Sequence, residues 1–372
     1  MSFTAVPAEE LTIAWMCIRS RFAPIALFGL LVISRAATAP TTLRQAADRR
    51  GVLIGTAVRP GLFSEHAYSA TLAREFNLVE PEDAMKWWVI RQDPDFFDFQ
   101  KGDEVVAFAQ AHGMKVRGHC LVWDHDNPEW LTHRQLNPAQ ASELLQQHIT
   151  RVMQHYAGQV FAWDVVNEAF EDKGEFKDSP WYNQPGIGFA HQSAGYVEQA
   201  FRWAHAADPK ALLFYNDNGA EVMNRKSDAI YEMVKDFKRR GVPIDGVGLQ
   251  MHISRLDIDT ASLATNIARL TALGLQVDIT EMDVSLPLQA DRAASKDDLQ
   301  RQAELYRSVI HACLENPGCT AIQSWGFTDK YSWIGSHTRG ARGAALPFDP
   351  SYQPKGAYNE ILRELLLHRQ PR

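Results

Sequence analysis

Eight short runs rich in β-branched and other apolar residues recur along the chain, separated by stretches long enough for a helix. The runs cover residues 52–58, 76–80, 115–123, 161–168, 211–217, 245–252, 276–281 and 321–325. The separating stretches repeat apolar residues at helical spacing, as at Leu144, Leu145, Ile149 and Val152. Apolar strands that alternate with helices are typical of a parallel sheet buried on both faces. Eight such units without a Gly/Ser-rich or Pro-rich linker predict the α/β class and a single (β/α)8 TIM barrel.

Residues 1–39 have the pattern of a secretory signal peptide. Two arginines precede an apolar run at 22–33, and a small-residue motif of the kind that signal peptidases cleave ends at Ala39. The apolar run is shorter than the roughly 20 residues that a membrane-spanning helix needs. We therefore expect cleavage and export to the periplasm or the medium, with residues 40–372 forming the barrel domain. Upstream acidic residues are unusual in a signal peptide, which makes Met16 an alternative translation start.

The charge balance of the chain argues against two classes of partner. The formal net charge is -7 and the sequence pI is about 6.0. No basic stripe is present that could neutralise nucleic-acid phosphates or anionic lipid headgroups. We therefore expect neither nucleic acid nor a membrane as a partner.

The cysteines fit a disulfide better than a metal site. Cys313 and Cys319 flank the turn-forming sequence Leu-Glu-Asn-Pro-Gly, which could bring the two thiols together. In an exported protein we expect them to form a disulfide. The cysteine spacings match no zinc motif, and no glycine motif for dinucleotides or phosphates follows any of the runs. We expect no cofactor and no bound metal.

Polar and aromatic residues collect where the predicted strands end, which is where barrel enzymes carry their reactive groups. The third run ends with His119 to Trp123, the fourth with Asn167 and Glu168, the sixth with Gln250 and His252, the seventh with Glu281 and Asp283, and the eighth with Trp325, followed by Trp333. Two glutamates among amides, a histidine and indole rings suit a neutral polyhydroxylated substrate. Cleavage of a glycosidic bond needs one protonated and one ionised carboxyl group, which such a pair can supply.

Several of these stretches resemble the motifs of glycoside hydrolase family 10, the xylanases. The matching stretches are Met85-Lys86-Trp87, Gly118-His119, Leu121-Val122-Trp123, Trp163-Asp164-Val165-Val166-Asn167-Glu168, Tyr215-Asn216-Asp217, Gly248-Leu249-Gln250 with His252, Thr280-Glu281-Met282-Asp283, and Trp325-Gly326 with Ser332-Trp333. They occur in family order, and the resemblance extends over about residues 52–358.

The resemblance implies a retaining endo-β-1,4-xylanase that hydrolyses internal bonds of xylan by double displacement, with residues 40–372 as its catalytic domain. Glu168 would be the general acid/base and Glu281 the nucleophile. Asn167 would contact the 2-hydroxyl of the cleaved sugar, and His252 and Asp283 would orient and polarise Glu281. The implied substrate-binding residues are Glu82, Asp83, Lys86, His119, Trp123, Asp126, Asn216, Gln250, Trp325 and Trp333. The implied partners are xylan and xylo-oligosaccharides, bound by a monomer.

The two catalytic carboxyl groups are expected to influence each other. The negative charge of Glu281 should raise the pKa of Glu168 and so keep it protonated for its role as an acid. Glycosylation of Glu281 removes that charge, after which Glu168 can act as a base.

Three residues depart from the family motifs. Asp83 and Asp126 stand where the family usually has Asn and Gln, both at the expected second glycone subsite. Asn218 stands where the family commonly has Tyr, so a stacking platform on the leaving-group side is lost. An ionised carboxylate accepts hydrogen bonds but cannot donate them. We therefore expect an altered second glycone subsite that repels a glucuronic-acid branch, with neutral drift at a tolerant subsite as the alternative.

Other functions remain open on the same fold. A retaining β-1,4-glucanase or an exo-glycosidase would differ in substrate, and a pocket crowded by Lys86, Trp325 and Trp333 favours xylose because xylose lacks the hydroxymethyl group of glucose. A glycan-binding protein without activity would not need both glutamates together with Asn167 and His252. A metal-dependent hydrolase would need clustered ligands, which the sequence does not display.

Overall fold

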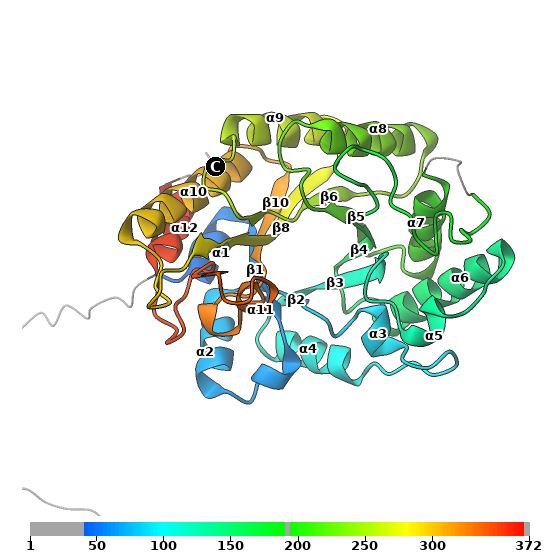
Figure 1. Ribbon diagram of the computed structural model, residues 1–372, viewed down its shortest axis with the longest axis horizontal. Coiled ribbons are helices and arrows are strands. Elements are labelled where there is room, and N and C mark those ends of the chain that lie inside the picture. The colour runs from blue at the N-terminus through cyan, green and yellow to red at the C-terminus, as the bar shows by residue number, and fades with distance from the viewer. Residues whose placement is uncertain (1–40, 190–193, 368–372) are drawn as a thin grey trace, which may run out of the picture. The chain divides into compact units, whose positions relative to one another are not determined.

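The computed structural model describes residues 41–189 and 194–367, and in this part of the chain eight parallel strands close into a barrel (Figure 1). The strands are β1 (Leu53–Val58), β2 (Leu78–Pro81), β3 (Lys115–Val122), β4 (Ala162–Asn167), β5 (Leu212–Asp217), β6 (Gly246–Leu249), β8 (Gln276–Val284) and β10 (Cys319–Ser324). Strand β10 pairs with β8 through Cys319 and Val277, and with β1 through Ala321 and Leu53. These pairings close the sheet and confirm the predicted TIM barrel.

A ring of helices surrounds the barrel (Figure 1). The longer helices are α1 (Leu43–Arg50), α2 (His66–Glu75), α4 (Gln100–Ala111), α6 (Pro138–His155), α7 (Gly195–Ala207), α8 (Arg225–Arg240), α9 (Thr260–Thr271), α10 (Lys296–Leu314) and α12 (Gly356–Leu367). Short elements lie in the loops: α3 (Trp87–Ile90), α5 (Glu129–Thr132), α11 (Ile334–His337), η1 (Pro60–Leu62), η2 (Asp329–Tyr331), and the antiparallel pair β9 (Leu286–Pro287) and β11 (Arg342–Gly343). Helix α1 was not predicted from the sequence, although Thr42 and Gln45 form a capping box at its start.

The sixth predicted strand is broken in two. Residues 245–252 form β6 and, after an interruption, β7 (His252–Ile253), which pairs with the end of β8 through His252 and Asp283. Met251 at the interruption has a φ of 69°, a left-handed conformation that is uncommon for a residue with a side chain. The turn in the backbone sets His252 beside β8.

The barrel interior is polar below the mouth. The guanidinium group of Arg117 is fully buried and contacts both Asp164 (Nε to Oδ1, 3.0 Å) and Asp278 (Nη1 to Oδ2, 3.0 Å). Loss of one partner from such a buried ion pair costs about 3–5 kcal/mol, because the other charge is left uncompensated. Oδ2 of Asp164 also lies 3.0 Å from Nδ1 of His119, so this network holds His119 in place at the barrel mouth.

The structure contains the predicted disulfide. Cys313 near the end of α10 is bonded to Cys319, the first residue of β10. The predicted signal peptide at 1–39 lies outside the described residues. Within the described ranges, no helix combines the length and the hydropathy needed to cross a membrane.

Candidate active site

Glu168 and Glu281 are joined across the barrel mouth by three side-chain amides. Gln250 donates from Nε2 to Oε1 of Glu168 at 3.0 Å and to Oδ1 of Asn167 at 3.1 Å. Asn216 donates from Nδ2 to the same Asn167 oxygen at 2.9 Å and to Oε1 of Glu281 at 2.7 Å. These bonds fix the two carboxyl groups relative to each other, and they bring together five residues that the sequence analysis selected.

The backbone at Glu168 is held in an unusual conformation. Glu168 directly follows β4 and has a φ of 55°, which costs energy for a residue with a side chain. Its amide donates to the carbonyl of Asn216 at 2.9 Å, and the amide of Ala169 donates to the hydroxyl of Tyr215 at 3.0 Å. Both bonds tie the residue to β5, so the neighbouring strand maintains the strained turn that presents Glu168 at the mouth.

The amide of Asn167 is oriented by its neighbours. Its oxygen accepts hydrogen bonds from both Asn216 and Gln250, so the opposite side of the amide carries the donor. Among the described residues no acceptor is found for Nδ2 of Asn167. This nitrogen is therefore free to donate to a sugar hydroxyl.

His252 bridges two acidic residues of β8. Its Nε2 lies 3.0 Å from Oε2 of Glu281, and its Nδ1 lies 2.9 Å from Oδ2 of Asp283. Burial lowers the pKa of His252, but the charges and hydrogen bonds of Asp283 and Glu281 outweigh it and hold the pKa well above its ordinary value. The imidazolium can then donate to both carboxylates. Trp333 donates from Nε1 to the same oxygen of Asp283 at 2.8 Å and helps to hold this carboxylate in place. Asp283 acts on Glu281 through His252, which contacts both residues.

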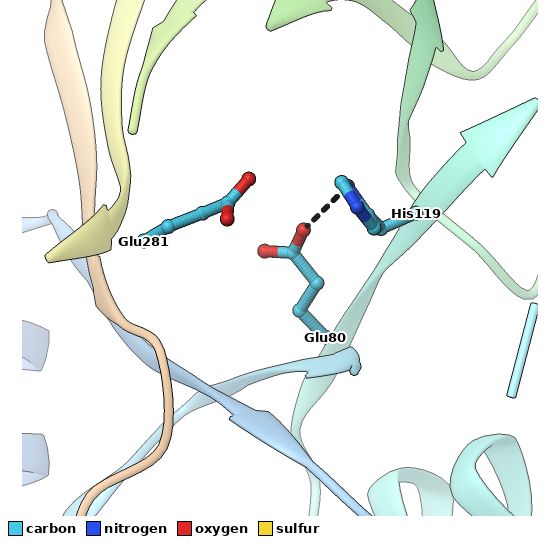
Figure 2. A group of neighbouring side chains, drawn as sticks. All are labelled: Glu80, His119 and Glu281. Carbon is cyan, nitrogen blue, oxygen red and sulfur yellow. Dashed lines mark ion pairs between the residues drawn. The ribbon is translucent and has the colours of Figure 1, made fainter. Parts of the chain in front are cut away.

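His119 lies between three acidic residues at the base of the mouth. Its Nδ1 is 3.0 Å from Oδ2 of Asp164 and 3.4 Å from Oε1 of Glu80, and Figure 2 shows Glu281 on the other side of the same space. The ring also meets Trp325 edge to face, with 5.3 Å between the ring centres. The contact between Asp164 and Nδ1 fixes the orientation of the His119 ring.

Lys177 forms an ion pair with Glu168 that the sequence analysis did not foresee. Its Nζ lies 3.3 Å from Oε2 of Glu168 and 3.9 Å from Asp124, and its side chain is largely buried. Burial raises the pKa of Glu168, but the hydrogen bond from Gln250 and the charge of Lys177 outweigh it, so the pKa lies below its ordinary value. The expectation of a raised pKa is therefore wrong for this structure, because it took into account neither the hydrogen bond from Gln250 nor the charge of Lys177.

Lys86 is held between the two acidic residues that depart from the family motifs. Its Nζ lies 3.1 Å from Oδ1 of Asp83 and 3.1 Å from Oδ2 of Asp126. The ammonium group also lies 4.8 Å from the ring centre of Trp123, within the range of a cation–π contact. Asp83 and Asp126 are about 42% and 43% exposed, so both can still accept hydrogen bonds from a ligand.

Glu82 is held by a partner that the sequence analysis did not select. Arg59 directly follows β1 and binds both carboxylate oxygens of Glu82, at 2.7 and 2.6 Å. Such a two-pronged pair fixes the plane of the carboxylate. Glu82 is therefore positioned at the mouth beside Lys86 and its two acidic partners.

Comparisons with known proteins agree with this geometry. The sequence profile of Glycosyl hydrolase family 10 matches residues 42–364. The chain belongs to this family. Family 10 enzymes are retaining glycoside hydrolases, and this protein is one of them.

Individual relatives match over most of their length. The chain is 40% identical to endo-1,4-beta-xylanase B of Thermotoga neapolitana, with 92% of this chain and 96% of the relative covered. It is 38% identical to a beta-1,4-xylanase of Dictyoglomus thermophilum, over 80% of this chain and 84% of the relative. The crystal structure of xylanase 10B from Thermotoga petrophila RKU-1 in complex with xylobiose is 41% identical, with a TM-score of 0.83 and 88% and 98% of the two chains covered.

Three residues of this family 10 site were missed by sequence reasoning. Arg59 and Glu80 both lie at strand ends, so the rule that selected Glu168 and Glu281 could have found them. Lys177 lies in the loop between β4 and α7, where no pattern marks it. The cluster of Glu80, His119 and Glu281 also escaped notice, because its members come from three strands far apart in the sequence.

Proposed function

We propose that the protein is a retaining endo-β-1,4-xylanase, with Glu281 as nucleophile and Glu168 as general acid/base. The observation that carries this proposal is the pair of glutamates joined through Gln250, Asn167 and Asn216 on a family 10 barrel. The names of the relatives from Thermotoga and Dictyoglomus support xylan as the substrate class, as does the xylobiose complex of the Thermotoga petrophila enzyme.

The reaction proceeds in two displacements. In the first, a carboxylate oxygen of Glu281 attacks the anomeric carbon while Glu168 gives its proton to the leaving glycosidic oxygen. In the second, Glu168 takes a proton from water, the water oxygen bonds to the anomeric carbon, and Glu281 leaves as a carboxylate. Asn167 donates from Nδ2 to the 2-hydroxyl of the sugar, a contact that stabilises the transition state.

His252 influences both displacements through its bond to Glu281. As an imidazolium it stabilises the carboxylate, which makes Glu281 a weaker nucleophile in the first step and a better leaving group in the second. Asp283 and Trp333 hold the imidazole ring in place from the other side. We assign these residues positioning roles.

The second glycone subsite is proposed to be rich in acceptors. Lys86 contributes one positive charge and Asp83 and Asp126 two negative charges, which leaves a net charge of −1 for the three side chains. A glucuronic-acid branch at this subsite meets electrostatic repulsion, whereas neutral xylosyl or arabinosyl units do not.

Export through the N-terminal segment is also proposed. The supporting observations are the signal-peptide pattern of residues 1–39 and the disulfide between Cys313 and Cys319, a bond typical of oxidising compartments. N-terminal sequencing of protein recovered from the periplasm or medium tests this, and an uncleaved chain retained inside the cell would contradict it.

The enzyme is also proposed to be a monomer. Light scattering of the purified enzyme tests this.

The decisive experiment measures release of reducing sugars from unsubstituted xylan, glucuronoxylan, arabinoxylan and carboxymethylcellulose in parallel. Glu281→Gln serves as the blank because glutamine keeps the shape of the side chain, whereas its neutral amide cannot attack the anomeric carbon to form the glycosyl-enzyme ester. Release from the xylans alone supports the proposal. Release only from the cellulose derivative would assign the protein a glucanase activity instead.

A further inference from the structure

Three buried side chains with metal-binding groups meet below the sugar site. Glu80 of β2, His119 of β3 and Glu281 of β8 are 0%, 2% and 3% exposed, and one ligand atom from each lies within 4.8 Å of the others. Figure 2 shows the two carboxylates and the imidazole pointing into one shared space. Glu80 has no part in the proposed double displacement.

Glu80 is short of partners in this position. Neither of its carboxylate oxygens has a hydrogen-bond partner among the described residues. The nearest potential cation is Nδ1 of His119 at 3.4 Å, and Asp164 already occupies that nitrogen at 3.0 Å. Burial and the negative charges of Asp164 and Glu281 raise the pKa of Glu80 well above its ordinary value, against the opposing charges of His119 and Arg117. The carboxyl group therefore needs a proton or another cation.

We propose that Glu80, His119 and Glu281 form a binding site for a divalent transition-metal ion such as Zn²⁺, and that the bound ion inhibits the enzyme. Two carboxylates and one imidazole match the ligands that Zn²⁺ takes, whereas Mg²⁺ and Ca²⁺ prefer oxygen ligands alone. Asp164 lies 3.0 Å from Nδ1 of His119, which is the kind of outer carboxylate contact that metal-binding histidines usually have. With metal–ligand distances of about 2.0–2.2 Å, the three side chains must move closer by about 1 Å or more.

The ion would lie between the carboxylates of Glu80 and Glu281, with one nitrogen of His119 as the third ligand. The proposed inhibition rests on the role of Glu281 as nucleophile, because Zn²⁺ bound to one of its carboxylate oxygens withdraws negative charge and so weakens its attack on the anomeric carbon.

The test compares Zn²⁺ binding to the full chain and to its Glu80→Gln variant by isothermal titration calorimetry in a buffer that does not chelate metals. We expect one site in the unchanged enzyme and at least a tenfold weaker affinity in Glu80→Gln. Asp83→Asn is the matched control, because it removes a carboxylate of the mouth outside the cluster and should leave the affinity unchanged. Xylotriose should compete with the ion, and Mg²⁺ should not replace it.

Hydrolysis of an aryl xylobioside, measured over the same Zn²⁺ concentrations, reports the inhibition separately. Equal affinity in both proteins, or no binding at millimolar Zn²⁺, would overturn the site. If Glu80→Gln does not fold, the anomalous signal of zinc in crystals of the unchanged enzyme locates the bound ion. A peak among Glu80, His119 and Glu281 supports the site, and a peak elsewhere overturns it. Binding that depends on Glu80 but does not inhibit would support the site and count against Glu281 as the nucleophile.

Discussion

Nζ of Lys177 lies 3.3 Å from Oε2 of Glu168, so the proposed acid/base is paired with a cation in a largely buried setting. The ammonium group stabilises the ionised form of Glu168, which suits the second displacement, where this residue acts as a base. The first displacement needs the protonated form. Activity is therefore expected to favour acidic pH.

Substitution of Lys177 tests this relationship. In Lys177→Met the cation is lost and the pKa of Glu168 rises, so Glu168 stays protonated to higher pH. We expect the alkaline limb of the kcat/KM profile for a xylo-oligosaccharide to move to higher pH. Lys173→Met is the control, since exposed Lys173 pairs with Glu175 in the same loop. A profile that moves equally in both variants, or in neither, would contradict the assigned role.

Azide rescue distinguishes the two catalytic glutamates. Glu168→Ala should still cleave aryl glycosides with good leaving groups, and azide in the vacated space should attack the glycosyl-enzyme to give the β-glycosyl azide. In Glu281→Ala, azide replaces the nucleophile, and a single displacement gives the α product. NMR of the products identifies the anomers. Glu82→Ala removes a carboxylate that is bound to Arg59 and should show no rescue. Reversed anomers would exchange the two assignments.

The acidic pair around Lys86 should affect substrate choice. Asp83→Asn combined with Asp126→Gln changes the net charge of the three side chains from −1 to +1, because only Lys86 stays charged. We expect the ratio of sugar release from glucuronoxylan to that from arabinoxylan to rise, and the lengths of the oligosaccharide products to shift. Chromatography of the products checks both. Unchanged products would mean that the two acidic residues have no role in specificity.

His148 should make stability depend on pH. The side chain is fully buried, stacks on Trp87 with 3.6 Å between ring centres, and neither ring nitrogen has a hydrogen-bond partner among the described residues. Burial holds the pKa of His148 well below its ordinary value, with a smaller contribution from Arg91. Below a pH of about 6.5 the unfolded chain therefore binds a proton that the folded chain does not, and stability falls as the pH is lowered.

Replacement of His148 by methionine removes this linkage. The Tm of His148→Met should fall less steeply than that of the unchanged enzyme between neutral pH and the low pKa of the folded state. Exposed His133→Met is the control and should keep the original slope. Differential scanning calorimetry at several pH values measures the difference. Parallel slopes in all three proteins would show that another group causes the acid sensitivity.

The fold could be predicted from local sequence patterns because buried parallel strands are apolar over their whole length. The run at 115–123 became β3 (Lys115–Val122), and all eight runs became barrel strands within a few residues. Barrel topology then accounts for much of the site, since it places the carboxyl ends of all strands at one mouth. Glu168 and Glu281 could be selected for that reason although 113 positions separate their numbers in the chain.

Other features of the site depend on contacts that no local pattern contains. The sequence identified His252 as a strand-end residue, but only the break at Met251 and the pairing with Asp283 explain its contact with Glu281. The sequence also identified Glu168 as a candidate acid but gave the wrong direction for its pKa, because a hydrogen bond from Gln250 and the charge of Lys177, which reaches Glu168 from a loop, both lower it. Periodicity in the chain determined strands, helices and the mouth they share. Tertiary structure decided which charges face each other there, because electrostatic interactions depend on distance and burial in space and not on separation along the chain.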